Sequence, residues 1–136
     1  MESNDLPTNL RWARFPLGRD ASEIGRARHL AASTLSGWGV ASELGGVELV
    51  VSELVTNALA HGSGPIELHV GLDGERLRIE VHDAGASASA PVPESGAGTV
   101  GGWGLQLVDQ LVDDWGLEHN GGTLVWAEKR ARPPST

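Results

Sequence analysis

Residues 66–83 read IELHVGLDGERLRIEVHD, and this segment determines the fold class. Apolar and polar residues alternate on both sides of the dipeptide Asp73-Gly74. Such alternation is typical of β-strands with one buried face, and Asp-Gly supplies the positive φ values of a tight turn. The segment therefore predicts an antiparallel hairpin with one face covered by helices and the other open to solvent.

Helical spacing of apolar residues occurs on both sides of this hairpin. It predicts a helix over Asp20–Trp38, which opens with Asp20 and Glu23 as a capping pair, and a second helix over Ser42–His61. A third helix is predicted over Gly104–Trp115.

Two further strands are predicted near the ends of the chain, an edge strand at Leu10–Leu17 and a strand at Thr123–Glu128. The expected fold is α+β, a two-layer sandwich in which about three helices cover one face of a mixed, mostly antiparallel sheet. We expect one domain over residues 10–130, with flexible termini at 1–9 and 131–136. A Rossmann unit is disfavoured because the strongest strand pair is a hairpin, not a parallel crossover.

Composition argues against several classes of function. The 136 residues have a formal net charge of −8, so there is no general attraction to nucleic acid or to an anionic membrane. Cysteine is absent, which excludes disulfides and thiolate metal sites. Without a secretory signal or an apolar run of about 18 residues, the expected location is the cytoplasm.

Glu53 and Asn57 are the first candidate site residues. They are four apart in the second predicted helix, so both side chains emerge on one face. A carboxylate and an amide oxygen suit magnesium, and a carboxylate can also accept the proton of a hydroxyl nucleophile. Such a pair on a helix is also common as a solvated surface pair, and that alternative stays open at this point.

Asp83 and Gly85 end the hairpin. Asp83 has the same parity as Leu77 and Ile79, so its carboxylate is predicted to face the helices, where it needs a donor such as a backbone amide or an adenine amino group. The alternative is an Asp that only begins a turn, with Gly85 supplying the bend.

Five glycines precede the third helix, and glycines before a helix N-terminus let backbone N–H groups approach phosphate; they are Gly96, Gly98, Gly101, Gly102 and Gly104. A flexible linker has the same composition. No lysine or arginine occurs between Ile79 and Glu128, so there is no Walker-type lysine in this region.

Three segments in this order resemble the N, G1 and G2 boxes of the GHKL (histidine-kinase-like) ATPase superfamily. They read SELVTNA at 52–58, VHDAG at 81–85 and GGWGLQLV at 101–108. The sequence SELVTNA is most similar to that of anti-sigma-factor serine/threonine kinases of actinobacterial type. The resemblance covers roughly residues 20–128 and implies the Bergerat ATP-binding fold.

The resemblance also implies roles for single residues. Asn57 would coordinate Mg²⁺, Glu53 would act as base or position water in phosphoryl transfer, and Asp83 would hydrogen-bond the adenine amino group of ATP. Gly85 would let the backbone approach the base. The lid over the phosphates would use Gly102 and Gly104, with Leu105 also assigned to cofactor binding.

The chain departs from the family pattern at two positions. Ser87 stands where the G1 box has its second glycine, and Trp103 stands where many relatives have arginine in the G2 box. Both changes fall on parts of the site that would contact nucleotide.

The function expected from the resemblance is ATP-dependent phosphorylation of an anti-sigma-factor antagonist, together with binding of a sigma factor; a homodimer is also implied. The alternative is a nucleotide-binding switch with little or no catalysis. The catalytic domain of a sensor histidine kinase is disfavoured because no helical pair with a phosphoacceptor histidine precedes the domain. For His61 and His69, structural roles are favoured over metal binding.

Overall fold

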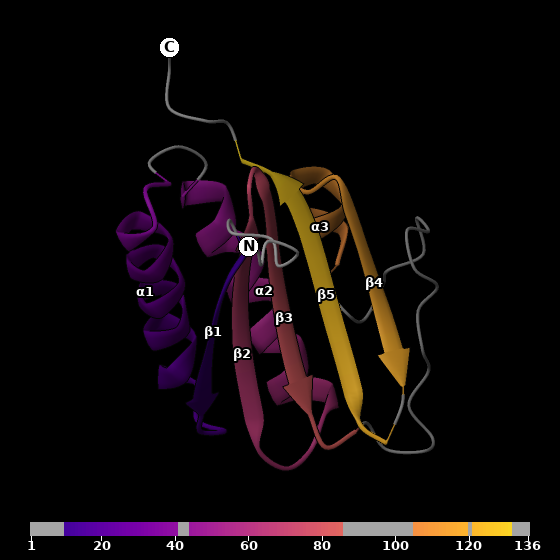
Figure 1. Cartoon of the computed structure of the whole chain (residues 1–136). Helices are drawn as coiled ribbons and strands as arrows, with labels where there is room; N and C mark the ends of the chain where they lie inside the picture. The colour runs from indigo at the N-terminus through magenta and orange to yellow at the C-terminus, as the bar shows by residue number, and fades with distance from the viewer. Residues whose placement is uncertain (1–9, 41–43, 86–104, 120, 132–136) are drawn as a thin grey trace, which may run out of the picture.

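A five-stranded sheet with three helices on one face forms the part of the protein that the computed structural model describes, residues 10–40, 44–85, 105–119 and 121–131 (Figure 1). The elements are β1 Leu10–Leu17, α1 Ser22–Gly37, α2 Leu44–His61, β2 Ile66–Asp73, β3 Arg76–Asp83, α3 Gln106–Leu111, β4 Asp114–His119 and β5 Thr123–Arg130. Within these residues, no helix has the length and apolar character needed to cross a bilayer.

The sheet has the strand order β1-β2-β3-β5-β4. Every strand pairing in the described residues is antiparallel, so the mixed sheet expected from the sequence is wrong in that detail, whereas the α+β sandwich is confirmed. The C-terminal strand β5 lies between β3 and β4, and β1 and β4 form the two edges.

The predicted hairpin is present as β2 and β3, but its turn lies one residue later than predicted. Asp73 pairs with Arg76, so it belongs to the strand and the turn residues are Gly74 and Glu75. Gly74 has φ of 64°, a left-handed conformation that residues with a Cβ adopt at a cost.

Replacing Gly74 with alanine is expected to lower the free energy of unfolding by about 1 kcal/mol, because the left-handed backbone strains any residue with a Cβ. Urea denaturation measures this change. Gly45→Ala is the matched control, because Gly45 is exposed in α2 and a Cβ there meets nothing within 4 Å. An equal loss in both variants would contradict the explanation.

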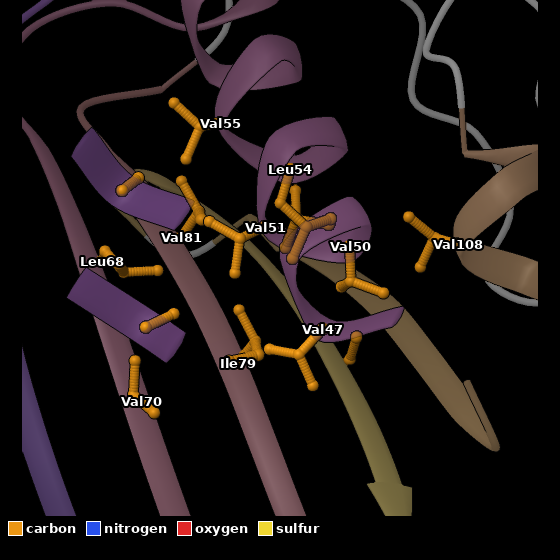
Figure 2. Close-up of a cluster of buried hydrophobic side chains, with 14 of the residues drawn as sticks. Val47, Val50, Val51, Leu54, Val55, Leu68, Val70, Ile79, Val81 and Val108 are labelled. Carbon is orange, nitrogen blue, oxygen red and sulfur yellow. The ribbon is translucent and has the colours of Figure 1, made fainter. Parts of the chain in front are cut away.

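The core lies between the sheet and α2, which passes behind β2 and β3 in Figure 1. Figure 2 shows Val47 and Val51 of α2 pointing toward the strands, where they meet Leu68 of β2 and Ile79 and Val81 of β3. These five side chains are at most 2% exposed. This packing fixes the side of α2 that faces the sheet, and Asn57 is buried on the same helix.

The first helix begins slightly later than predicted. Ala21 takes the N-cap position without a side-chain hydrogen bond, and α1 starts at Ser22. Asp20 still accepts a hydrogen bond from the Ser22 N–H at 3.3 Å, while Glu23 Oε1 accepts one from the Gly18 N–H at 2.9 Å. The two acids therefore cap this end separately and do not form a reciprocal pair. The predicted N-terminal residues of the second helix, Ser42 and Glu43, lie outside the described residues.

The third helix is much shorter than predicted, and a strand was missed. The structure has α3 only at Gln106–Leu111, and Val112 is already extended, with φ of −122° and ψ of 167°. Trp115 lies in β4, yet its indole N–H donates to Asp109 Oδ1 of α3 at 2.8 Å, and its side chain is buried. The helical spacing thus correctly identified side chains that pack in the core. It wrongly predicted that Trp115 lies in a helix, because the backbone there is a strand.

Candidate functional site

A cleft opens where the C-terminal end of α2 meets the ends of β3 and β5. Its lining combines apolar side chains with polar groups from all three elements: Asn57, Ala58, His61, Gly62, Val81, Asp83, Thr123 and Val125. The sheet supplies one wall, and the last turn of α2 with the following loop supplies the other. Two of the residues predicted from the sequence, Asn57 and Asp83, therefore line the same cleft.

Asn57 is buried in this lining with an unused hydrogen-bonding group. Its side chain is 4% exposed, and its Nδ2 has no hydrogen-bond partner among the described residues. A buried polar atom without a partner costs about 1–3 kcal/mol, and native proteins rarely leave one without a reason. Because the two ends of an amide are assigned from their hydrogen bonds, either Nδ2 can donate to a bound anion or, after a flip, Oδ1 can face a cation.

Asp83 lies directly over the loop that follows α2. A Cβ added to Gly62 would be 2.1 Å from Asp83 Oδ2, so only glycine leaves room for this carboxylate. The other oxygen, Oδ1, accepts the Gly85 N–H at 2.7 Å. The carboxylate faces the helices, as its parity predicted, and Gly85 has φ of 126°, a value that side chains with a Cβ rarely adopt.

Burial raises the pKa of Asp83 above its usual value, and the Gly85 N–H together with the positive charge of Arg19 opposes this effect only in part. The folded state therefore disfavours the ionised carboxylate more than the unfolded state does. It follows that the charge on Asp83 lowers stability at neutral pH, and that this cost disappears as the pH falls through the raised pKa. A carboxylate kept at such a cost is typical of a binding site.

Arg19 holds the loop beneath Asp83 in place. Its guanidinium donates to four carbonyl oxygens, those of Ala58, Leu59, Gly62 and Gly64, at 2.9 to 3.2 Å. These are carbonyls at the end of α2 and in the following loop, which a cation suits because the helix dipole is negative there. Arg19 therefore holds the backbone of Gly62 in place, and Gly62 in turn contacts the carboxylate of Asp83.

A second set of bonds ties the hairpin end to the same loop. The Ala84 N–H donates to the Ser63 carbonyl at 2.8 Å, and Ser63 Oγ donates to the Gly85 carbonyl at 2.7 Å. The Asp83–Gly85 segment is thus held from both sides, which makes the cleft wall rigid. None of Arg19, Gly62 or Ser63 was predicted as a site residue. The second predicted helix ends at His61, directly before Gly62, and no motif pointed to Arg19.

The other predicted site residues have different surroundings. Glu53 is half-buried, one turn before Asn57 on α2, but it is not among the cleft residues. The side chain of Leu105 is fully buried in the core. Gly102 and Gly104 lie outside the described residues.

Comparisons with known proteins agree on the type of domain. The sequence profile of the histidine kinase-like ATPase domain matches residues 18–129. Among solved structures, the chain resembles the RsbU and RsbW domains of Rv1364c from Mycobacterium tuberculosis, with a TM-score of 0.69 and 24% identity. The match covers 90% of this chain and 33% of that one, and so shows a shared fold over about a third of the larger protein. No curated protein sequence matches the chain significantly.

Proposed function

The chain belongs to the histidine kinase-like ATPase family, and on that premise we propose that it is an ATP-dependent serine/threonine kinase of the anti-sigma-factor kind. One observation carries the proposal: Asn57, whose Nδ2 has no partner among the described residues, and Asp83, whose carboxylate is disfavoured by burial, line one cleft. A fitting ligand offers a hydrogen-bond acceptor or a cation to Asn57 and a hydrogen-bond donor to Asp83. A magnesium nucleotide offers all of these.

Asp83 is assigned to the adenine ring. Its ionised carboxylate would accept a hydrogen bond from the exocyclic amino group of the base. The hydrogen bond from the Gly85 N–H to Asp83 Oδ1 keeps the carboxylate directed into the cleft. Gly85 and Gly62 keep side chains away from the position of the base. The apolar lining residues Val81 and Val125 supply a surface for the ring.

Asn57 and Glu53 are assigned to the reacting end of the nucleotide. When bound, Mg²⁺ neutralises charge on the phosphate oxygens. The amide of Asn57, turned so that Oδ1 faces the ion, would hold it. Glu53 would take the proton of a serine or threonine hydroxyl as its oxygen forms a bond to the γ-phosphorus and the bond to the ADP oxygen breaks. Gly102, Gly104 and the backbone at Leu105 would serve as the phosphate lid.

The proposed partners are a sigma factor and the anti-sigma-factor antagonist that the kinase would phosphorylate, with a homodimer as the proposed assembly and the cytoplasm as the proposed location. The segment SELVTNA at 52–58 and the likeness to a chain with an RsbW domain support this. The net charge of −8 and the absence of a membrane-crossing helix among the described residues are consistent with a protein partner.

A second function is favoured by the scarcity of cationic side chains available to phosphate: a nucleotide-dependent switch that regulates its partner by binding alone. No lysine or arginine occurs between Ile79 and Glu128, and Trp103 stands where many relatives have a lid arginine. Arg19, which is close to the cleft, already donates to four carbonyls. Phosphoryl transfer would therefore rely on Mg²⁺ and backbone N–H groups for charge neutralisation.

Transfer of labelled phosphate from ATP to a candidate antagonist distinguishes the two functions. Stoichiometric labelling supports the kinase. Nucleotide-dependent binding of the antagonist without labelling supports the switch, and neither labelling nor nucleotide binding would overturn both.

Replacing Asp83 with asparagine is expected to weaken ATP binding about tenfold or more, because the amide loses an acceptor and gains a donor that faces the adenine amino group. GTP, which has no amino group at that ring position, should not lose affinity. The free energy of unfolding at neutral pH should not fall, because the substitution removes a charge that burial disfavours. Isothermal titration calorimetry with both nucleotides measures the first two effects. Equal losses for ATP and GTP would show that Asp83 does not read the base.

A further inference from the structure

Four ionisable side chains form a cluster on the face of the sheet opposite the nucleotide cleft. Glu67 and His69 come from β2, and Glu80 and His82 come from β3; we call them the His–Glu quartet. In the register of the hairpin, Glu67 lies opposite His82 and His69 lies opposite Glu80. The open face of a sheet normally carries independent solvated side chains, but these four contact one another.

Two members of the quartet are buried although none of the helices in the described residues covers this face. His69 is 6% exposed and Glu80 is 9% exposed. The ring of Trp12 in β1 meets His69 edge-on at a centroid distance of 5.7 Å, and the ring of His82 stacks on His69 at 4.1 Å. The alternation in the hairpin predicts that polar residues such as His69 lie on the face open to solvent. The structure corrects this for His69, because neighbouring side chains shield it.

The hydrogen bonds of the quartet leave His69 Nδ1 facing a carboxylate oxygen of Glu80. Glu67 Oε1 lies 2.8 Å from His69 Nε2, and Arg78 Nε donates to Glu80 Oε2 at 2.5 Å. The remaining oxygen, Glu80 Oε1, lies 2.7 Å from His82 Nε2 and 3.6 Å from His69 Nδ1.

A neutral imidazole has one N–H and one lone pair. If His69 donates its Nε2–H to Glu67, its Nδ1 lone pair faces a carboxylate oxygen. Two electron-pair donors that face each other offer a cation a place between them, and Arg78 is held on the other side of Glu80 by its bonds to Glu80 Oε2 and Glu128. A metal ion would supply that positive charge.

We propose that the His–Glu quartet is a site for a divalent transition-metal ion of the zinc type, with His69, Glu80 and His82 as ligands. One ligand atom from each of the three lies within 4.8 Å of the others. Two imidazoles and a carboxylate are a ligand set that Zn²⁺ accepts, and they suit Mg²⁺ poorly. The remaining coordination position is left to water.

The surroundings of the three ligands match those of known metal sites. Glu67 holds the far nitrogen of His69, as an outer carboxylate does in a carboxylate–histidine–metal arrangement, and Arg78 orients the carboxylate of Glu80 in the same way. The stacked rings lie at 26° to each other, so their lone pairs do not converge as they stand. His82 must turn to bind, and its side chain, 36% exposed, has solvent on one side in which to do so.

The quartet uses none of the residues that line the proposed nucleotide cleft. Asn57 of α2 and Asp83 of β3 line a cleft on the helix side of the sheet, whereas the quartet faces the opposite side of the same sheet. A titration with Zn²⁺ therefore tests the metal site without nucleotide. A failure of nucleotide binding would contradict the proposed function but not this inference.

The test uses the full chain without an affinity tag, freed of metal by a chelator and then titrated with Zn²⁺ alone against a chromophoric competitor. The wild type is expected to bind one Zn²⁺ per chain. His82→Gln is expected to weaken that binding at least about tenfold, because loss of even an outer-shell partner of a metal ligand costs about 10- to 100-fold. His29→Gln is the matched control, because His29 is exposed on α1 and should bind no metal.

Two further measurements separate loss of a ligand from loss of the fold. Circular dichroism of His82→Gln should match the wild type, because this side chain is partly exposed. Co²⁺ in place of Zn²⁺ should give visible absorption bands in the wild type that are absent in His82→Gln. No Zn²⁺ binding by the wild type, or equal affinity in His82→Gln and the wild type, would overturn the inference.

Discussion

Replacing Glu53 with glutamine is expected to lower the rate of phosphoryl transfer to the antagonist by about 10²- to 10⁴-fold, the range typical for loss of a general base. Glutamine keeps the size and hydrogen-bonding reach of the side chain but cannot take a proton. Binding of ATP should be unchanged, because Glu53 is not among the residues that line the cleft. A single-turnover assay with labelled ATP measures the rate directly.

Glu48→Gln is the matched control for this experiment. Glu48 is also a half-buried glutamate of α2, but it lies five residues earlier, so its side chain emerges on a different side of the helix. Equal rates for Glu53→Gln and the wild type would exclude Glu53 as the base. Equal losses in Glu48→Gln and Glu53→Gln would point to a general effect of charge on α2.

Replacing Asn57 with alanine is expected to abolish stabilisation of the protein by magnesium nucleotide. Ligand present at 100 times its dissociation constant stabilises the native state by about 2.7 kcal/mol, and this increment should disappear. The ligand-free protein should lose no more than about 1 kcal/mol, because the Nδ2 atom that is removed has no partner among the described residues. Thermal unfolding with and without ATP and Mg²⁺ measures both quantities.

The neighbouring Thr56→Ala serves as the control, because Thr56 is exposed on the same turn of α2. It should keep the full shift in unfolding temperature with nucleotide. If Asn57→Ala also keeps this shift, the orphaned amide has another cause and the assignment of Asn57 fails. If the ligand-free Asn57→Ala protein is strongly destabilised, the amide has a structural role instead.

The sequence predicted the parts of the fold that depend on local pattern. The alternation at 66–72 and 77–81 predicted the hairpin, because one buried face demands a period of two. The stripe of α2 likewise predicted its buried residues, since a helix packed on a sheet shows its apolar residues three and four apart. The parity of Asp83 with Ile79 correctly placed its carboxylate on the helix side of the sheet.

The errors arise where tertiary contacts override the local pattern. Trp115 has the spacing of a helix residue relative to Leu111, but it lies in β4, where it pairs with Ala127 of β5, and its indole N–H donates to Asp109 of α3. Arg19 could not be predicted as part of the site, because its four acceptors lie 39 to 45 residues further along the chain. His69 was misjudged for the same reason, since its shielding comes from side chains on β1 and β3.

The place of β5 in the sheet has a consequence for how the protein is made. Synthesis runs from the N-terminus, so β1, β2 and β3 can pair while the growing chain still lacks the strand that completes the sheet. Until Thr123–Arg130 leaves the ribosome, the backbone N–H and C=O groups along one side of β3 have no partner. An open edge of this kind pairs readily with other chains. Premature termination before residue 123 would therefore leave an aggregation-prone fragment, one that cellular quality control must capture or degrade.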